Sequence, residues 1–549
     1  MKKQNFIKGS IILMASAAAA KLLGALFKIP LTNMLGGVGM SYFSCAYSLF
    51  MPVYALTVTG LSTAVARMTA QSTALGMYEN AARIRRTALL LFSAAGIAGS
   101  LFTFLTAKPF CIYAADCPEA APAAAMIAPA VFFGCVTAVE RGYYEGRSNM
   151  YPTAFSQLTE GAVKVIAGLF LCSYVMENPQ QILRYFTQGT DIRAVAAAAG
   201  ILGVTLSSAG AALFFVLVRI FDSRQCPEGE KHLMSRRRIA AELTSTALPT
   251  GISAVVTNLT ALIDMGTVIG CISYFGCNVN VPEDVAVNEI PHFIYGSFAG
   301  IALTVFNLVP SVTNMLGKGI LPSVTEAWEN GDAAALKKRT MQALLTAAVI
   351  AAPAACGMSA LSGDILHFLF PKQNAEAEVC INALRWLMPG MICLCVSFPL
   401  FSMLQAIGKA SAPLKIMIGG AVVKLAGNLL LIPFAGVDGA AVSTSVCYFA
   451  ILAAAIVVYV RESGITIDIK PFAAVFYSAA MCGASAFLTS ELLKAQGIGR
   501  LMVLSVSTAA GAVVYTAALI ATGGTAAGYL GISCGKIKTC PHEKMRTGV

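Results

Sequence analysis

Residues 153–177 read TAFSQLTEGAVKVIAGLFLCSYVME, which is long enough to cross the ~30 Å hydrocarbon core of a bilayer as one helix. A lysine, Lys164, stands near the middle of this apolar run. The pattern returns later in the chain, where residues 412–434 read APLKIMIGGAVVKLAGNLLLIPF with Lys424 near the middle. A lysine at the centre of a bilayer costs ~2.5–3.5 kcal/mol even on a permissive insertion scale. The two stretches therefore predict a membrane protein of two related halves with a polar path between them.

The whole chain is apolar enough to be a membrane protein. Of its 549 residues, 57% are hydrophobic and 12% are charged, roughly half the charged fraction of a soluble protein. Its mean hydropathy is +0.73. Windows of membrane-spanning length predict an all-α polytopic fold with fourteen transmembrane helices. The predicted segments are 9–34, 41–66, 87–107, 120–140, 153–177, 194–218, 240–271, 291–316, 340–361, 382–407, 412–434, 439–460, 471–493 and 501–522.

The net charge of +11 is concentrated in loops on one side of the predicted membrane. Basic clusters occur at 83–86, 231–238 and 337–339, all on the side of the N-terminus. Cytoplasmic loops carry such an excess of Lys and Arg, so both termini are predicted in the cytoplasm and the protein in the cell membrane. This distribution argues against nucleic acid as a partner. The N-terminal run also resembles a signal peptide, but it continues past Lys28, which makes it too long for one.

The sixteen cysteines are mostly scattered singly along apolar runs, where cysteine acts as a small packing residue. Two pairs lie at predicted external loops. For Cys111 with Cys117, and for Cys271 with Cys277, the sequence leaves open a disulfide or two thiols.

Short matches between the two halves appear in the same order along the chain. Residues 79–87 resemble 332–340, and residues 25–28 resemble 261–264. The matches predict two six-helix lobes related by a pseudo-two-fold axis along the membrane normal, because six crossings return the chain to the same side. The predicted parts are an N-terminal lobe at 1–218, a cytoplasmic linker at 219–239, a C-terminal lobe at 240–460, two further helices at 461–525 and a cytoplasmic tail at 526–549.

Ionisable and amide side chains inside the predicted spans are the candidate functional residues, because such groups are costly in a bilayer and mark transport pathways. The substrate-binding candidates are Lys21, Lys28, Gln157, Glu160 and Lys164, and the ion-coupling candidates are Asp264, Lys424 and Asn428. Structural alternatives exist: Glu160 and Lys164 are four residues apart and can pair on one helix face, and Lys28 can extend to the membrane surface. An Asp within a span is also a natural Na⁺ or H⁺ site.

The excess of cations among the candidates favours an anionic substrate. Several lysines can share a phosphate or diphosphate group, and the surrounding apolar helices suit a lipid tail. The sequence contains no phosphate-binding Gly-x-x-x-x-Gly-Lys-Ser/Thr loop and no zinc-binding His-Glu-x-x-His motif. The chain is therefore predicted not to be an enzyme, with no metal site and no cofactor. Na⁺, H⁺ and the membrane potential stay open as energy sources.

Motifs in the first part of the chain carry a further signal. They are FIKGS at 6–10, KLLG at 21–24, KIPL at 28–31, LGGVG at 35–39 and GLSTAVAR at 60–67. In this order they resemble the stage V sporulation protein B group of polysaccharide flippases, within the multidrug/oligosaccharidyl-lipid/polysaccharide exporter superfamily. The resemblance implies alternating-access export of an undecaprenyl-diphosphate-linked glycan, a peptidoglycan precursor such as lipid II, in spore cortex or cell-wall synthesis. A monomer is expected, and cell-wall synthases stay open as partners.

The resemblance also suggests roles for individual residues. Lipid II flippases of this superfamily carry Arg-x-Leu-Gly in the first helix, and Lys21 stands in the place of that arginine. The Arg-Asp pair that follows in those proteins is replaced by Phe27 and Lys28. Some members bind sodium through an Asp in helix 7 and polar residues in helices 11 and 12, which the resemblance matches to Asp264 and Asn428. Lys424 lies one turn from Asn428, and our hypothesis is that its ammonium stands where the sodium ion would.

Two other functions stay open. A multidrug cation antiporter of the same superfamily needs buried acids for cationic drugs, whereas the embedded charges of this chain are mainly basic. A non-transporting scaffold for cell-wall synthases does not explain why cations are kept in mid-membrane.

Overall fold

The computed structural model describes residues 6–186, 190–221, 234–276, 281–282, 285–409 and 411–522. All regular structure in these ranges is helical, which confirms the predicted all-α class. The elements are α1 (Phe6–Tyr54), η1 (Ala55–Thr59), α2 (Gly60–Ala74), α3 (Tyr78–Tyr113), η2 (Pro118–Ala120), α4 (Ala121–Ile127), α5 (Pro129–Gly146), α6 (Tyr151–Glu177), α7 (Pro179–Leu183), α8 (Ile192–Phe221), α9 (Arg236–Phe275), η3 (Val287–Glu289), α10 (Ile290–Ser297), η4 (Phe298–Ala302), α11 (Leu303–Phe306), α12 (Leu308–Glu329), α13 (Ala333–Ala360), α14 (Ser362–Leu369), α15 (Asn374–Ala406), α16 (Ala412–Ser463), α17 (Lys470–Ala495) and α18 (Arg500–Thr522).

Within the described ranges, twelve helical runs are long and apolar enough to cross a membrane. Two of them exceed one crossing: Ala15–Ala74 has 60 residues and Ala412–Ser463 has 52, against ~20 for a typical span. Each is bent at one glycine with a positive φ angle, Gly36 at 67° in α1 and Gly436 at 54° in α16. Residues with a side chain rarely adopt this conformation, so glycine permits the kink.

Both kinks fall at predicted boundaries between segments, within 34–41 and within 434–439. The number of crossings beyond the twelve runs stays a prediction. The predicted end of segment 291–316 is wrong, because the helix breaks at Asn307 and the spanning run ends at Phe306. Pro310 explains the break: it has no N–H to donate to the carbonyl four residues earlier.

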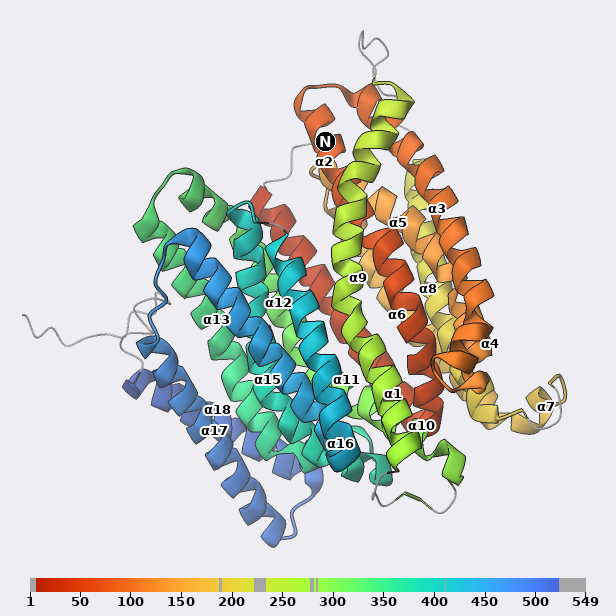
Figure 1. The fold of residues 1–549 in the computed structure, drawn as a ribbon, viewed down its shortest axis with the longest axis vertical. Helices are drawn as coiled ribbons and strands as arrows, with labels where there is room; N and C mark the ends of the chain where they lie inside the picture. The colour runs from red at the N-terminus through yellow and green to blue at the C-terminus, as the bar shows by residue number, and fades with distance from the viewer. Residues whose placement is uncertain are drawn as a thin grey trace, which may run out of the picture.

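Figure 1 shows α3 to α8 on one side of the bundle and α12 to α18 on the other, with α9 between them. Among the close pairs, α6 packs along α8 and α15 packs along α16, while α17 and α18 form a hairpin against α13. Helix α1 contacts both α6 and α10. The division into two lobes and the symmetry axis that relates them stay predictions.

Glycines allow α1 and its neighbours to approach closely. A methyl group built at Gly203 of α8 would overlap the backbone of Gly168 in α6, and one built at Gly296 of α10 would overlap the carbonyl of Gly37 in α1. Small residues at such crossings let helix backbones touch in membrane proteins. These contacts fix the position of α1 relative to α10, and of α6 relative to α8.

Two π-helices, η1 and η4, interrupt the spanning helices. They begin at Ala55 and Phe298, which are 243 residues apart (298 − 55). A repeat that would relate the two π-helices stays a prediction. Such turns are rare and occur frequently at functional sites.

Three of the four cysteines of the predicted external loops lie in the described residues. Cys111 and Cys117 are buried free thiols, so the disulfide considered for this pair is not formed, and both pack into the apolar core. Cys271 is also a free thiol, while Cys277 lies outside the described residues. Residues 222–233 of the predicted linker and the whole predicted tail also lie outside them.

Candidate functional site

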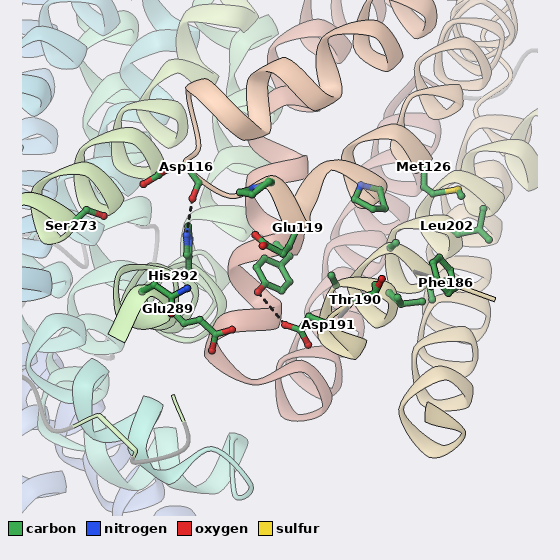
Figure 2. Close-up of a pocket in the computed structure, with 18 residues that line it drawn as sticks. Asp116, Glu119, Met126, Phe186, Thr190, Asp191, Leu202, Ser273, Glu289 and His292 are labelled. Atoms are coloured by element: carbon green, nitrogen blue, oxygen red, sulfur yellow. Dashed lines mark hydrogen bonds between the residues drawn. The ribbon is translucent and has the colours of Figure 1, made fainter. Parts of the chain in front are cut away.

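One cavity, of about 800 Å³, lies where the chain leaves α3, α7 and α9 at one end of the bundle. Figure 2 shows four acids in its wall: Asp116, Glu119, Asp191 and Glu289. Within the described residues, no lysine or arginine lines this cavity. Its charge therefore disfavours a phosphate group. Sequence reasoning missed this cavity, because its acids come from separate short loops.

Two of these acids are held by one arginine behind the wall. The Arg193 guanidinium lies 2.9 Å from Asp191 Oδ2 and 2.6 Å from Glu289 Oε1. Tyr42 of α1 donates a hydrogen bond of 3.1 Å to Asp191, and His292 of α10 lies 2.9 Å from the carbonyl oxygen of Asp116 (Figure 2). The network joins α1 and α8 to η3 at this end of the bundle.

A second cavity, of about 400 Å³, lies between α1 and α6 on one side and α9 to α11 on the other. Its wall is mostly apolar and contains three of the predicted functional residues, Lys28, Lys164 and Asp264. The other lining residues are Gly24, Phe27, Phe43, Ser44, Tyr47, Ser48, Met51, Asn258, Ala261, Tyr295, Ala299, Leu303 and Asn307. This cavity is the candidate functional site, because it combines cations with apolar walls.

Lys28 reaches across the cavity from α1 to the π-helix η4. Its Nζ donates a hydrogen bond of 2.8 Å to the carbonyl oxygen of Ala299. Thr32, one turn further along α1, lies 3.4 Å from the next carbonyl of η4, that of Gly300. The Lys28 ammonium therefore faces the cavity, which goes against the alternative that this side chain extends to the membrane surface.

Lys164 projects into the same cavity from α6. Its Nζ lies 5.9 Å from the ring centroid of Phe27, and Tyr47 lines the cavity with it. Among the described ion pairs, none joins Glu160 to Lys164. The Glu160 carboxylate instead lies 2.8 Å from Nη2 of Arg141 in α5, a better partner because a guanidinium binds a carboxylate with fixed geometry.

The other two substrate-binding candidates do not line either cavity. Gln157 of α6 accepts a hydrogen bond of 3.0 Å from Ser16 of α1, so it joins the two helices. Lys21 is exposed and lies seven residues before Lys28, a separation of ~10 Å along α1.

The three predicted ion-coupling residues meet in one buried cluster. The Lys424 Nζ lies 2.7 Å from Asp264 Oδ2, and the Asn428 amide donates hydrogen bonds to Asp264 Oδ1 at 3.0 Å and to Thr267 Oγ1 at 2.8 Å. The exposed fractions of Asp264, Lys424 and Asn428 are 3%, 2% and 0%. The cluster joins α16 to α9, and through Asp264 it forms part of the wall of the second cavity. Of its residues, Thr267 was not singled out by the sequence.

Sequence reasoning also missed polar residues that line the second cavity. The side-chain amides of Asn258 and Asn307 donate to carbonyls one turn back in their own helices, at 2.8 Å and 2.7 Å, so the oxygens remain as acceptors for a ligand. The signal that could have found them is a polar residue in the middle of a predicted membrane span.

The charges around the second cavity add up to a positively charged site. Two ammonium groups, those of Lys28 and Lys164, lie on one side of the cavity. On the other side the Asp264 carboxylate is already neutralised by Lys424.

Comparison with known proteins places the chain in a family. The model of the family described as polysaccharide biosynthesis protein matches residues 6–328, and the MatE model matches residues 297–430. The chain is similar to stage V sporulation protein B of Bacillus subtilis (strain 168), with 25% identity over 90% of each chain. It is also similar to the lipid II flippase MurJ of that organism, with 22% identity over 84% of this chain and 83% of the relative.

Solved structures give the same fold. A structure of lipid II flippase MurJ in an inward closed conformation has a TM-score of 0.62 at 14% identity, covering 92% of this chain and 98% of that one. An inward-facing multidrug resistance MATE family transporter of the MOP superfamily has a TM-score of 0.63 at 14% identity, covering 85% and 98%. The relatives and structures named here are transporters or flippases where their function is stated, which agrees with the prediction that the chain is not an enzyme. The family model covers more than half of the sequence, so the chain is a multi-pass membrane protein that belongs to the polysaccharide biosynthesis protein family.

Proposed function

We propose that this protein is an alternating-access flippase that exports an undecaprenyl-diphosphate-linked glycan, a peptidoglycan precursor such as lipid II, in spore cortex or cell-wall synthesis. The observation that carries the proposal is the pair of ammonium groups, Lys28 and Lys164, in the wall of the second cavity. The similarity to stage V sporulation protein B and to a lipid II flippase supports the substrate class.

The chemistry of the second cavity suits one end of such a substrate. A diphosphate carries charge that two ammonium groups can share through short, charge-assisted hydrogen bonds. The volume of about 400 Å³ lies in the ~300–1,000 Å³ range of small-molecule sites. The cavity would therefore hold the diphosphate and the sugar next to it, with the asparagine oxygens as acceptors for sugar hydroxyls.

Binding would change a contact between two helices. In the structure the Lys28 Nζ of α1 donates a hydrogen bond of 2.8 Å to the Ala299 carbonyl of η4. A phosphate oxygen is a stronger acceptor than a carbonyl, because both partners of the bond are charged. The substrate would take the Lys28 ammonium from Ala299, and this change in the contact between α1 and η4 would link binding to the opening of the cavity.

The cluster around Asp264 would shift the equilibrium between the inward-open and outward-open states, with the Lys424 ammonium in place of a sodium ion. With Lys424 at 2.7 Å, the carboxylate already has a cation beside it. Removing the ammonium by Lys424→Ala leaves oxygens of Asp264, Thr267 and Asn428 in a buried space, and oxygen ligands are what small hard cations prefer. We expect transport by Lys424→Ala to become more sodium-dependent than transport by the unchanged protein. Lys415→Ala, at an exposed position of the same helix, is the control, and an unchanged sodium dependence of Lys424→Ala would contradict the hypothesis.

Two other functions predict different transport results from the proposed flippase. The acidic cavity of about 800 Å³ favours a cation antiporter, which would move organic cations against a proton or sodium gradient. A scaffold for cell-wall synthases would move neither cations nor lipids. Both can be separated from the proposed flippase in one assay.

The test is reconstitution of the purified protein in liposomes with fluorescent lipid II. We expect the protein to transfer the labelled head group from one leaflet to the other, measured by its access to an impermeant quencher, and not to transport a cationic dye. Protein-free liposomes give the background. Dye transport without lipid transfer would favour the antiporter, and transport of neither would favour the scaffold.

A further inference from the structure

An ion pair outside the second cavity lies next to Lys164 on α6. Glu160 and Lys164 are both on α6, four residues apart, a spacing at which opposite charges attract on a helix. In the structure Arg141 of α5 takes the Glu160 carboxylate, with Nη2 2.8 Å from Oε2. The Arg141 Nε also donates a hydrogen bond of 2.8 Å to Ser156 Oγ, one turn before Glu160.

We propose that Arg141 is a positioning residue for substrate binding, which holds Glu160 away from Lys164 and so keeps the Lys164 ammonium available to an anionic group in the cavity. The inference rests on the proposed function and adds to it a residue that does not line the cavity.

The charges in this region explain the role. Arg141, Glu160 and Lys164 together carry one net positive charge, and the ion pair places it on Lys164, because Glu160 is neutralised by Arg141. Without Arg141, only Glu160 and Lys164 remain of these three groups. Lys164 is on the same helix face as Glu160, so its ammonium would become the partner of the Glu160 carboxylate. The second cavity would then lose the charge of one of its two lysines without any change in the lysine itself.

An arginine suits this role better than a lysine. Its guanidinium uses two separate nitrogens, one toward Ser156 and one toward Glu160, and its planar group holds both bonds in one orientation. The side chains of Arg141 and Glu160 are 17% and 26% exposed, so water screens their attraction only in part.

The experiment compares binding of undecaprenyl diphosphate to the full-length protein in nanodiscs, measured by native mass spectrometry. We expect Arg141→Gln to weaken binding by about tenfold, comparable to the loss of one charge-assisted hydrogen bond. The double variant Arg141→Gln with Glu160→Gln should recover most of this loss, because no carboxylate remains to capture Lys164. Arg141→Lys should lie between the unchanged protein and Arg141→Gln.

A second arginine–glutamate pair provides a matched control. Arg85 of α3 lies 2.6 Å from Glu140 of α5, and neither residue lines the second cavity. Arg85→Gln should lower the melting temperature without weakening lipid binding, which separates the loss of an ion pair from the loss of a binding charge.

Three results would overturn the inference or its basis. If Arg141→Gln binds the lipid as tightly as the unchanged protein while Lys164→Gln binds it weakly, the positioning role is wrong and the proposed function stands. If the double variant binds as weakly as Arg141→Gln, the arginine acts on the fold rather than on Lys164. If Lys164→Gln itself binds normally, the proposed site is wrong.

Discussion

Lys164→Gln is expected to weaken the binding of undecaprenyl diphosphate by about 10- to 100-fold, and the addition of Lys28→Gln to weaken it by a similar factor again. A hydrogen bond to a charged group contributes about 1.5–3 kcal/mol, and about 1.4 kcal/mol corresponds to a factor of ten. The two lysines reach the second cavity from different helices, α6 and α1. Glutamine removes the charge and keeps a polar, somewhat shorter side chain.

The measurement is a lipid titration in nanodiscs, followed by transfer of labelled lipid II in liposomes, where the rate should fall with the affinity. Lys415→Gln, an exposed lysine of α16, is the control for a general loss of positive charge. Normal binding by the double variant would exclude the second cavity as the site of the diphosphate.

Lys21→Gln distinguishes the site predicted from the sequence from the site that the structure forms. The sequence includes Lys21 among the substrate-binding residues, whereas in the structure its side chain is exposed and does not line the second cavity. We expect Lys21→Gln to weaken binding by less than Lys164→Gln does. An equal loss would extend the site along α1 toward its N-terminus.

The cost of burying charge made the charged residues of the second cavity predictable. A bilayer penalises every embedded ionisable group, so a single sequence is enough to find Lys28, Lys164 and Asp264. The same argument selects Lys424 and Asn428, although they follow Asp264 by 160 and 164 residues. The penalty indicates that each group needs a partner or a polar cavity, and the structure supplies both.

Partner choice could not be predicted, because it depends on how helices pack. The spacing of Glu160 and Lys164 on one helix suggested a pair, but Arg141 at the end of a neighbouring helix competes for the same carboxylate. The acidic cavity was missed for the same reason: Asp116, Asp191 and Glu289 are far apart in sequence and meet only in the folded chain. By contrast, the kink positions at Gly36 and Gly436 were predictable as gaps between apolar segments.

Asp264→Asn is expected to destabilise the protein by about 3–5 kcal/mol, the usual cost of removing one partner from a buried ion pair. The reason is the position of Lys424, which is 2% exposed and has its Nζ 2.7 Å from the Asp264 carboxylate. An asparagine at 264 leaves that ammonium without a counter-charge. Thermal unfolding of the purified protein in detergent measures the loss. Asp468→Asn, which breaks the more exposed pair with Lys337 at 3.1 Å, is the control, and exposed pairs contribute at most about 1 kcal/mol.

The double variant Asp264→Asn with Lys424→Met separates stability from transport. The main cost of breaking a buried pair is the charge left without a partner, and this variant leaves none, so it should recover most of the lost melting temperature. If the pair serves the fold alone, the recovered protein will also transfer lipid II at the normal rate. Our proposal requires the opposite: a stable protein whose transfer rate stays low, because the charge that biases the opening of the cavity has been removed. A single Asp264→Asn variant as stable as the unchanged protein would contradict the ion pair itself.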